Sequence, residues 1–275
     1  NKTVDFGASD SFMSDKALRA VSKKILHIPV CLGAVVLSYN LPEVSQLRLT
    51  PEVVAQIFLG KISNWNDPKI QEINPGVTLP DLRVVSVHRS DGSGTTFIFT
   101  DYLSKVSPAW QRIVGTGKSV NWPDGLGGKG NAGVAGIVKT TPGAIGYIGH
   151  VYANQNKMNV AKVKNKSGNY ILPSLDSVSK AANTKIPQDT RASITNTSAK
   201  MGYPISGFTW ILVFQDQNFN SRSIKQATET KKLVEWMIGD GQRFVKPLLY
   251  APLTESIANK SQRIIDSMTY SGKTL

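Results

Sequence analysis

The stretch VVSVHRSDGSGTTFIFTDYL, residues 84–103, joins a short apolar run to a segment whose apolar residues recur at helical spacing. The small polar and glycine residues between them predict the order strand, turn, helix. The first N–H groups of a helix have no acceptor within the helix, and the helix dipole places partial positive charge there. The stretch therefore predicts an α/β unit with an anion-binding site where its helix begins.

The side chains of this turn have the chemistry that a tetrahedral oxyanion requires, and inorganic phosphate is the anion that they favour. Ser93 and Thr95 supply hydroxyl donors, and Gly94 lets the backbone approach the anion closely. Arg89 supplies a forked, permanently charged donor, and Asp91 is expected to orient that arginine. In the alternative interpretation, Ser93 and Thr95 only cap the helix, while Arg89 and Asp91 form a surface ion pair.

The segment RSDGSGT, residues 89–95, resembles the signature of bacterial high-affinity phosphate-binding proteins, the extracytoplasmic receptors of phosphate ABC transporters. Four more stretches agree with that family and follow its order: VDFGASD at 4–10, IFLGKISNW at 57–65, GLGGKGN at 125–131 and PGAIGY at 142–147. The resemblance covers most of residues 1–150, weakens beyond them, and resumes with YPISG at 203–207.

The resemblance implies an α/β protein with the two-lobed type II periplasmic-binding-protein fold. Two extended crossovers, which we place near residues 30–33 and 203–206, would join the lobes, and phosphate would bind in the cleft between them. One lobe would comprise residues 1–32 plus 205–275, and the other residues 33–204. The family's function is to bind phosphate and deliver it to the transmembrane permease subunits of an ABC transporter.

The same resemblance implies a periplasmic or otherwise extracytoplasmic monomer that is not an enzyme, and it leaves open whether a lipoprotein anchor is attached. Members of the family begin with an additional strand–helix–strand segment that contributes two phosphate-binding turns. This chain starts directly at NKTV, so we expect the functional protein to be longer. Without that segment, the first lobe is expected to expose an unpaired strand edge and apolar surface.

Asp10 matches the family's cleft aspartate, and the resemblance implies that it provides specificity. Phosphate near neutral pH still carries a proton that a carboxylate can accept, whereas sulfate carries none and would leave the buried carboxylate without a donor. Ser9 is either a further donor or a turn residue. Without the resemblance, Asp10 could equally be a plain turn residue or a helix cap.

The chain has a formal net charge of +13 at pH 7, whereas its 40% share of apolar residues is ordinary. Lysine and arginine are spread along the sequence, so nucleic-acid binding is not expected, and the charge favours a general attraction of anions.

Cys31 is the single cysteine, which excludes an intrachain disulfide. His27, His88 and His150 lack metal-ligand spacing, and neither a metal nor another cofactor is expected. The dinucleotide-like GLGGKG at 125–130 does not follow a buried strand.

Two other functions remain as alternatives. A phosphate-ester hydrolase could use Ser93 or Thr95 as its nucleophile, although no motif places a histidine beside them as a base. A basic surface protein could instead bind acidic polymers through its positive charge.

Apolar periodicity and helix caps predict the remaining elements. Strands are expected at residues 25–30, 34–39, 84–87, 145–148 and 208–214. Helices are expected to start after Thr50 and to cover residues 94–103, 130–140, 174–182, 222–239 and 254–269. The tryptophans at positions 65, 110, 122, 210 and 236 are expected to pack in the core or between elements.

Overall fold

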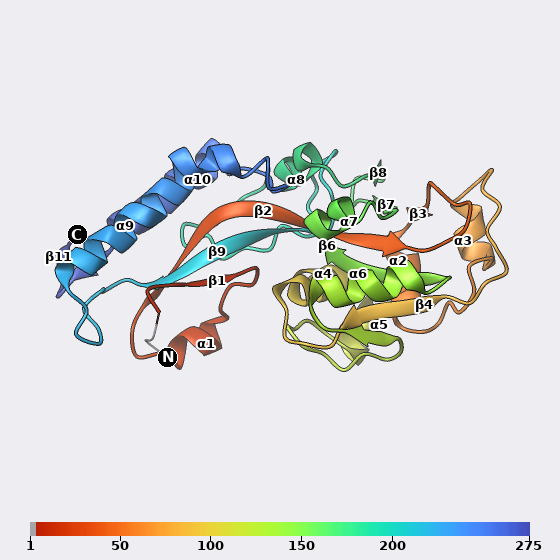
Figure 1. Cartoon of the computed structure of the whole chain (residues 1–275), viewed down its shortest axis with the longest axis horizontal. Coiled ribbons are helices and arrows are strands. Elements are labelled where there is room, and N and C mark those ends of the chain that lie inside the picture. Colours follow the sequence, from red (N-terminus) through yellow and green to blue (C-terminus); the bar gives the residue numbers. More distant parts are fainter. Residues whose placement is uncertain (1–3) are drawn as a thin grey trace. The chain divides into compact units, whose positions relative to one another are not determined.

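The computed structural model describes residues 4–275 (Figure 1). The chain is an α/β protein, as predicted, and it divides into two compact units. Unit 1 comprises Asn1–Leu32, of which residues 4–32 are described, together with Lys185–Ser193 and Phe208–Leu275. Unit 2 comprises Gly33–Thr184 and Ile194–Gly207.

The two units differ from the predicted lobes at residues 185–193 and 205–207, and the assignment of the lobes stays a prediction. Residues 185–193 belong to unit 1 because hydrogen bonds attach them there. The Thr190 hydroxyl donates to the His27 carbonyl at 2.7 Å, and the Trp210 indole N–H donates to the Thr190 carbonyl at 3.3 Å.

Unit 1 is built on part of strand β2 (Ile25–Tyr39), most of strand β9 (Ser206–Phe214) and the short strand β1 (Gly7–Ser9). β1 pairs antiparallel with β9, with Ala8 opposite Ile211. A buried apolar cluster joins the strands to two long helices: Leu26, Ile28, Ile211, Val213, Val234, Ile238, Ile265 and Met268. The other elements of unit 1 are α1 (Asp15–Arg19), α9 (Ile224–Ile238), η1 (Asp240–Phe244), α10 (Glu255–Asp266), β10 (Thr269–Tyr270) and β11 (Lys273–Thr274).

Unit 2 contains the remainder of β2 followed by β6 (Ala144–Gly149), β4 (Val85–Arg89) and β5 (Leu126–Gly128) in one sheet. β6 runs antiparallel to β2 and parallel to β4, and β4 runs parallel to β5. The helices of unit 2 are α2 (Pro51–Phe58), α3 (Pro68–Glu72), α4 (Gly94–Val106), α5 (Pro108–Ile113), α6 (Gly130–Thr140), α7 (His150–Gln155) and α8 (Leu175–Ala181). A second sheet consists of β3 (Arg48–Leu49), β7 (Lys162–Lys164) and β8 (Tyr170–Ile171).

Helix caps confirm the predicted starts of several helices. The Thr50 hydroxyl accepts the N–H of Val53 at 3.3 Å, with Pro51 at the first helical position of α2. Ser174 and Ser223 each form a capping box at the start of α8 and α9. These caps satisfy N–H groups that have no acceptor within their own helix.

Strand β2 departs from the prediction, because residues 25–30 and 34–39 belong to one continuous strand rather than two. The Leu32 N–H donates to the Ala251 carbonyl at 2.9 Å, and the Ala251 N–H donates back at 2.8 Å. The Val35 N–H then donates to the Ile205 carbonyl at 2.9 Å. Partners distant in sequence therefore keep the backbone extended through Gly33, where the sequence alone suggested a break.

Trp236 packs between elements rather than in the core, because its ring centroid lies 5.9 Å from that of Phe244 in η1. Trp65, Trp110 and Trp210 are fully buried, whereas Trp236 is 45% exposed. The buried side chains of α9 include Val234 and Ile238, which lie four residues apart on one face of the helix. Trp236 lies halfway between them in sequence, and therefore on the opposite face. No helix within residues 4–275 is long and apolar enough to cross a membrane.

Candidate functional site

The predicted anion turn lies in unit 2, between the end of β4 at Arg89 and the start of α4 at Gly94. Ser93 is the N-cap of α4, and its hydroxyl accepts the N–H of Thr96 at 3.3 Å. The N–H of Ser93 donates to the carbonyl of Lys118 at 2.9 Å, which ties the turn to a second loop. Ser93 thus caps the helix, as the alternative interpretation expected, and its hydroxyl keeps one proton to donate to a ligand.

The start of α4 also presents donors that the protein does not use. Across residues 4–275, the Gly94 N–H, the Thr95 N–H and the Thr95 hydroxyl donate no hydrogen bond. The Thr95 residue is only 7% exposed. Donors of this kind at the N-terminus of a 13-residue helix favour an anion.

Arg89 and Asp91 lie side by side, as the sequence suggested, and form a bidentate pair. Arg89 Nε donates to Asp91 Oδ1 at 2.7 Å, and Nη2 donates to Oδ2 at 2.6 Å. The N–H of Gly130, at the start of α6, also donates to Asp91 Oδ1 at 3.0 Å. The arginine, and to a lesser extent the Gly130 N–H, hold the pKa of Asp91 far below its usual range. The Arg89 side chain is therefore fixed in orientation, with its Nη1 group not used by Asp91.

Tyr147 belongs to this site, although no sequence pattern indicates a role for it. Its hydroxyl accepts the backbone N–H of Arg89 at 3.0 Å and lies 2.7 Å from Thr96 Oγ1. Tyr147 is part of the PGAIGY motif, but nothing in that motif indicates a contact with a turn 58 residues earlier.

Asp10 and Ser9 lie in unit 1, at the end of β1. The Thr209 hydroxyl donates to Asp10 Oδ1 at 2.6 Å, a partner that the sequence analysis missed. The Ser9 hydroxyl donates to the Ser11 carbonyl at 2.8 Å and accepts the Ser11 N–H at 3.1 Å. Ser9 thus forms a local turn with Ser11, and its role toward a ligand stays a prediction. Asp10 does not cap the next helix, because Ser14 is the N-cap of α1.

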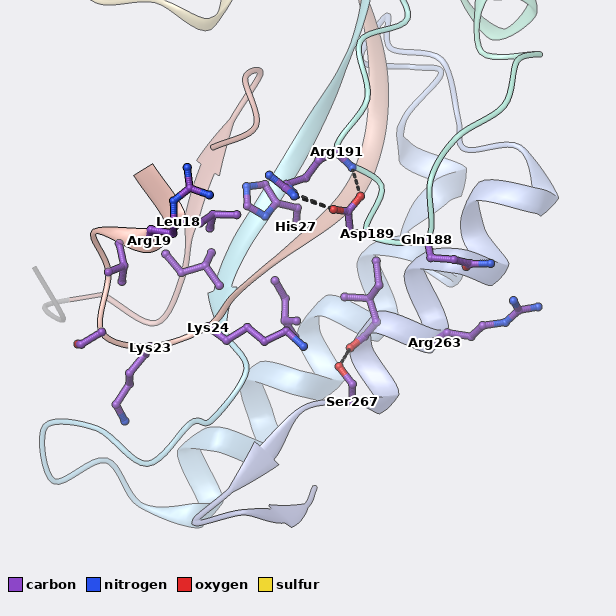
Figure 2. Close-up of a pocket in the computed structure, with 15 residues that line it drawn as sticks. Leu18, Arg19, Lys23, Lys24, His27, Gln188, Asp189, Arg191, Arg263 and Ser267 are labelled. Carbon is purple, nitrogen blue, oxygen red and sulfur yellow. Dashed lines mark hydrogen bonds and ion pairs between the residues drawn. The ribbon is translucent and has the colours of Figure 1, made fainter. Parts of the chain in front are cut away.

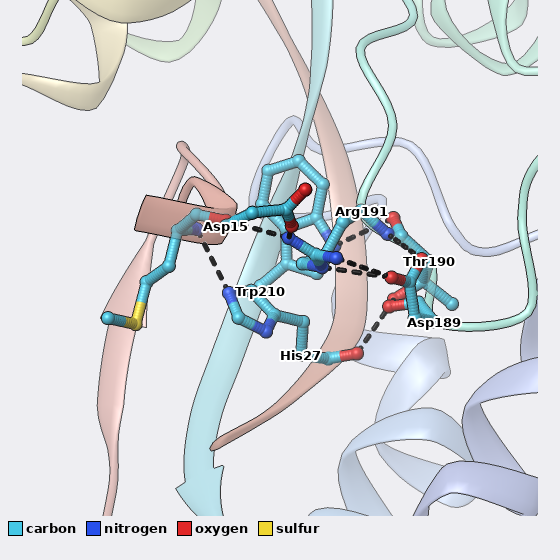
Figure 3. A network of polar contacts seen from close by, with 7 residues as sticks. Asp15, His27, Asp189, Thr190, Arg191 and Trp210 are labelled. Atoms are coloured by element: carbon cyan, nitrogen blue, oxygen red, sulfur yellow. Dashed lines mark hydrogen bonds and ion pairs between the residues drawn. The ribbon is translucent and has the colours of Figure 1, made fainter. Parts of the chain in front are cut away.

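Of the predicted site residues, the structure therefore brings five together within unit 2: Arg89, Asp91, Ser93, Gly94 and Thr95. Asp10 and Ser9 belong to unit 1. The backbone that follows Asp10 is anchored there by a polar network around His27 and Arg191 (Figure 3).

In this network, His27 Nε2 accepts the N–H of Met13 at 3.0 Å. Arg191 Nη1 donates to the Met13 carbonyl at 3.1 Å and to Asp15 Oδ1 at 2.7 Å. Arg191 Nε donates to Asp189 Oδ2 at 2.9 Å. The backbone of Met13, three residues after Asp10, is therefore held at its N–H by His27 and at its carbonyl by Arg191.

We expect His27 to make the protein sensitive to acid. The residue is 2% exposed, and its burial, helped by the nearby Arg191, lowers its pKa from 6.5 to about 4 even though Asp189 opposes this effect. Below pH 6.5 the unfolded chain binds a proton at His27 that the folded protein does not bind. The contribution of His27 to the free energy of unfolding is therefore present in full above pH 6.5 and is lost as the pH falls toward 4. Between pH 7 and 4.5 the loss from His27 should be about 2 kcal/mol.

Urea unfolding at the two pH values measures this loss. His27→Gln is the control, because an amide oxygen can accept the Met13 N–H but does not titrate. The variant should lose less stability than the unchanged protein over the same pH interval. Equal losses in the two proteins would show that His27 is not the titrating group.

Unit 1 also contains a pocket of about 620 Å³ (Figure 2), and none of the predicted phosphate ligands is among its lining residues. Its lining combines apolar side chains such as Leu18 and Ile264 with the cations Arg19, Lys24 and Arg263. Within residues 4–275, no group of three or more histidine, cysteine, aspartate or glutamate side chains is arranged to hold a metal ion.

Comparison with known proteins places the chain in a family. The family model described as "PBP superfamily domain" matches residues 1–240. The phosphate-binding protein PstS of Pasteurella multocida is 42% identical over 270 residues, which are 95% of this chain and 76% of that protein. PstS of Xylella fastidiosa is 40% identical over 263 residues, which are 94% of this chain and 71% of that protein.

Solved structures show the same fold at lower sequence identity. A phosphate-binding protein from Stenotrophomonas maltophilia matches with a TM-score of 0.72 at 19% identity, covering 100% of this chain and 85% of that chain. A high-affinity periplasmic phosphate-binding protein with bound phosphate, PfluDING, matches with a TM-score of 0.72 at 21% identity, covering 96% and 79%. The resemblance inferred from the sequence motifs is confirmed. The chain belongs to the PBP superfamily and, within it, to the PstS family of phosphate-binding proteins.

Proposed function

We propose that this chain binds inorganic phosphate without transforming it and delivers the ion to the permease of a phosphate ABC transporter. The observation that carries the proposal is the set of donors where α4 begins. The Gly94 and Thr95 N–H groups and the Thr95 hydroxyl donate no hydrogen bond within residues 4–275, and Arg89 lies at the end of the preceding strand. Backbone donors, hydroxyls and a forked cation together suit a tetrahedral oxyanion.

We further propose that Asp10 selects phosphate over sulfate. A carboxylate accepts hydrogen bonds and cannot donate them, and the Thr209 hydroxyl already donates to one of its oxygens. A phosphate that still carries a proton can donate to such a group. Sulfate cannot, and it would add a like charge next to the carboxylate.

Transport requires a partner and a compartment. We propose that the chain acts as a monomer outside the cytoplasm and delivers phosphate to the transmembrane permease subunits. The solved relative PfluDING is described as periplasmic, which supports that location. Release to the permease requires that the permease bind the phosphate-free state more tightly than the phosphate-bound state.

Hydrolysis of phosphate esters is the weaker alternative, because His88, the histidine nearest to Ser93 in sequence, already makes other contacts. The His88 ring stacks on Trp122, with ring centroids 4.8 Å apart, and its Nδ1 lies 3.2 Å from the Arg89 carbonyl. The Ser93 hydroxyl already accepts the N–H of Thr96. A nucleophile without a base in reach is poorly activated.

Isothermal titration of the folded protein with phosphate, and then with sulfate, tests the proposed function. We expect one phosphate per chain and no measurable heat from sulfate. A folded sample that binds no phosphate would overturn the proposal. Turnover of a chromogenic phosphate ester, lost in a Ser93→Ala variant, would favour the hydrolase instead.

A further inference from the structure

Tyr147 connects the two sides of the anion turn. It lies on β6, and its side chain is fully buried. Its hydroxyl contacts the Arg89 N–H at the end of β4 and the Thr96 hydroxyl in the first turn of α4. One phenol oxygen thus links the residue that carries the guanidinium to the helix that carries the free N–H donors.

The contacts to Arg89 and to Thr96 both depend on the phenol oxygen of Tyr147. A phenol oxygen has one proton and two lone pairs, and the Arg89 N–H occupies one lone pair. The contact to Thr96 uses either the phenol proton or the other lone pair. Removing the oxygen leaves the N–H of Arg89 without this acceptor in a half-buried position, which is unfavourable.

The Tyr147 ring is held in place, so its hydroxyl is a fixed reference point. The ring stacks against Phe99 with centroids 4.5 Å apart and against Trp122 at 5.5 Å. Its strand also pairs with the strand that ends at Arg89, with Val87 opposite Gly146. Tyr147, on the neighbouring strand β6, therefore sets the spacing between Arg89 and the start of α4.

We propose that Tyr147 is a positioning residue of the phosphate site, which sets the spacing between Arg89 and the N–H donors of α4 without touching phosphate. This proposal rests on the proposed function for its effect on affinity. Its effect on the order of the turn can be measured without phosphate.

Tyr147→Phe tests the proposal, and Tyr102→Phe is its matched control. Tyr102 lies on α4 in the same unit and is fully buried, and its hydroxyl has no hydrogen-bond partner within residues 4–275. Both variants remove one buried phenol oxygen, but only the first removes the link. Phosphate titration should show affinity about three- to tenfold weaker for Tyr147→Phe and unchanged for Tyr102→Phe. Equal effects of the two variants on affinity would overturn the proposal.

Thr96 supplies a second test of the same link. Thr96→Val should weaken phosphate binding, whereas Thr96→Ser, which keeps the hydroxyl, should bind normally. The double variant Tyr147→Phe, Thr96→Val should lose less affinity than the sum of the single losses, because the two groups share one interaction. Fully additive losses would contradict a shared link.

Hydrogen exchange separates failure of this proposal from failure of the proposed function. In phosphate-free protein, the Arg89 amide should exchange about tenfold faster in Tyr147→Phe than in Tyr102→Phe. If the protein binds no phosphate but this difference is present, Tyr147 orders the turn and the proposed function fails alone. If phosphate binds and the Arg89 amide is equally protected in both variants, Tyr147 does not position the site.

Discussion

Asp10→Asn is expected to let the protein bind sulfate, which we expect the unchanged protein to reject. An amide can donate a hydrogen bond to a fully deprotonated oxyanion and carries no charge to repel it. Rejection by an unpaired polar group can amount to several orders of magnitude in affinity. We therefore expect the ratio of phosphate to sulfate affinity to fall by at least about 100-fold in this variant. Titration with each anion, with competition for the tighter one, measures this ratio.

Asp15→Asn is the matched control for charge. Asp15 belongs to the same unit, and it pairs with Arg191 at 2.7 Å. This substitution changes the net charge of the chain by the same amount but should leave sulfate rejection intact. Selectivity that is unchanged in Asp10→Asn would exclude Asp10 as the discriminating group.

Arg89→Ala is expected to weaken phosphate binding by about 1.5–3 kcal/mol, the range for a hydrogen bond to a charged group, or roughly 10- to 150-fold in affinity. The upper part of the range is expected, because the substitution also removes the bidentate partner of Asp91. The Asp91 carboxylate would then keep the hydrogen bond from the Gly130 N–H but lose its cationic partner. Its negative charge beside the anion turn would repel phosphate.

Two further variants show whether the loss comes from this guanidinium. Arg89→Lys keeps the positive charge but loses the fork, so its affinity should fall between the unchanged protein and Arg89→Ala. Arg112→Ala removes an exposed arginine from α5 in the same unit and should bind phosphate normally. A negligible loss in Arg89→Ala would mean that phosphate binds elsewhere than at this turn.

The helices were predictable wherever their signals are local. Helix α6 (Gly130–Thr140) covers the residues that the sequence indicated, and α4 and α8 differ from their predicted ranges by only a few residues at their ends. A cap acts through a hydrogen bond to a residue two or three positions away, so the chain order specifies it. The strand β1 was not predicted, because three residues carry too little pattern and its partner β9 lies about 200 residues later.

The sequence by itself determined the family, the α/β class and the donors of the anion turn, because these depend on short motifs and neighbouring residues. The tertiary structure decided which groups hold those donors in place. The Gly130 N–H reaches Asp91 across 39 residues, the Tyr147 hydroxyl reaches Arg89 across 58, and the Thr209 hydroxyl reaches Asp10 across 199. Each contact forms only when packed strands and helices bring distant segments together, and no local pattern encodes that pairing.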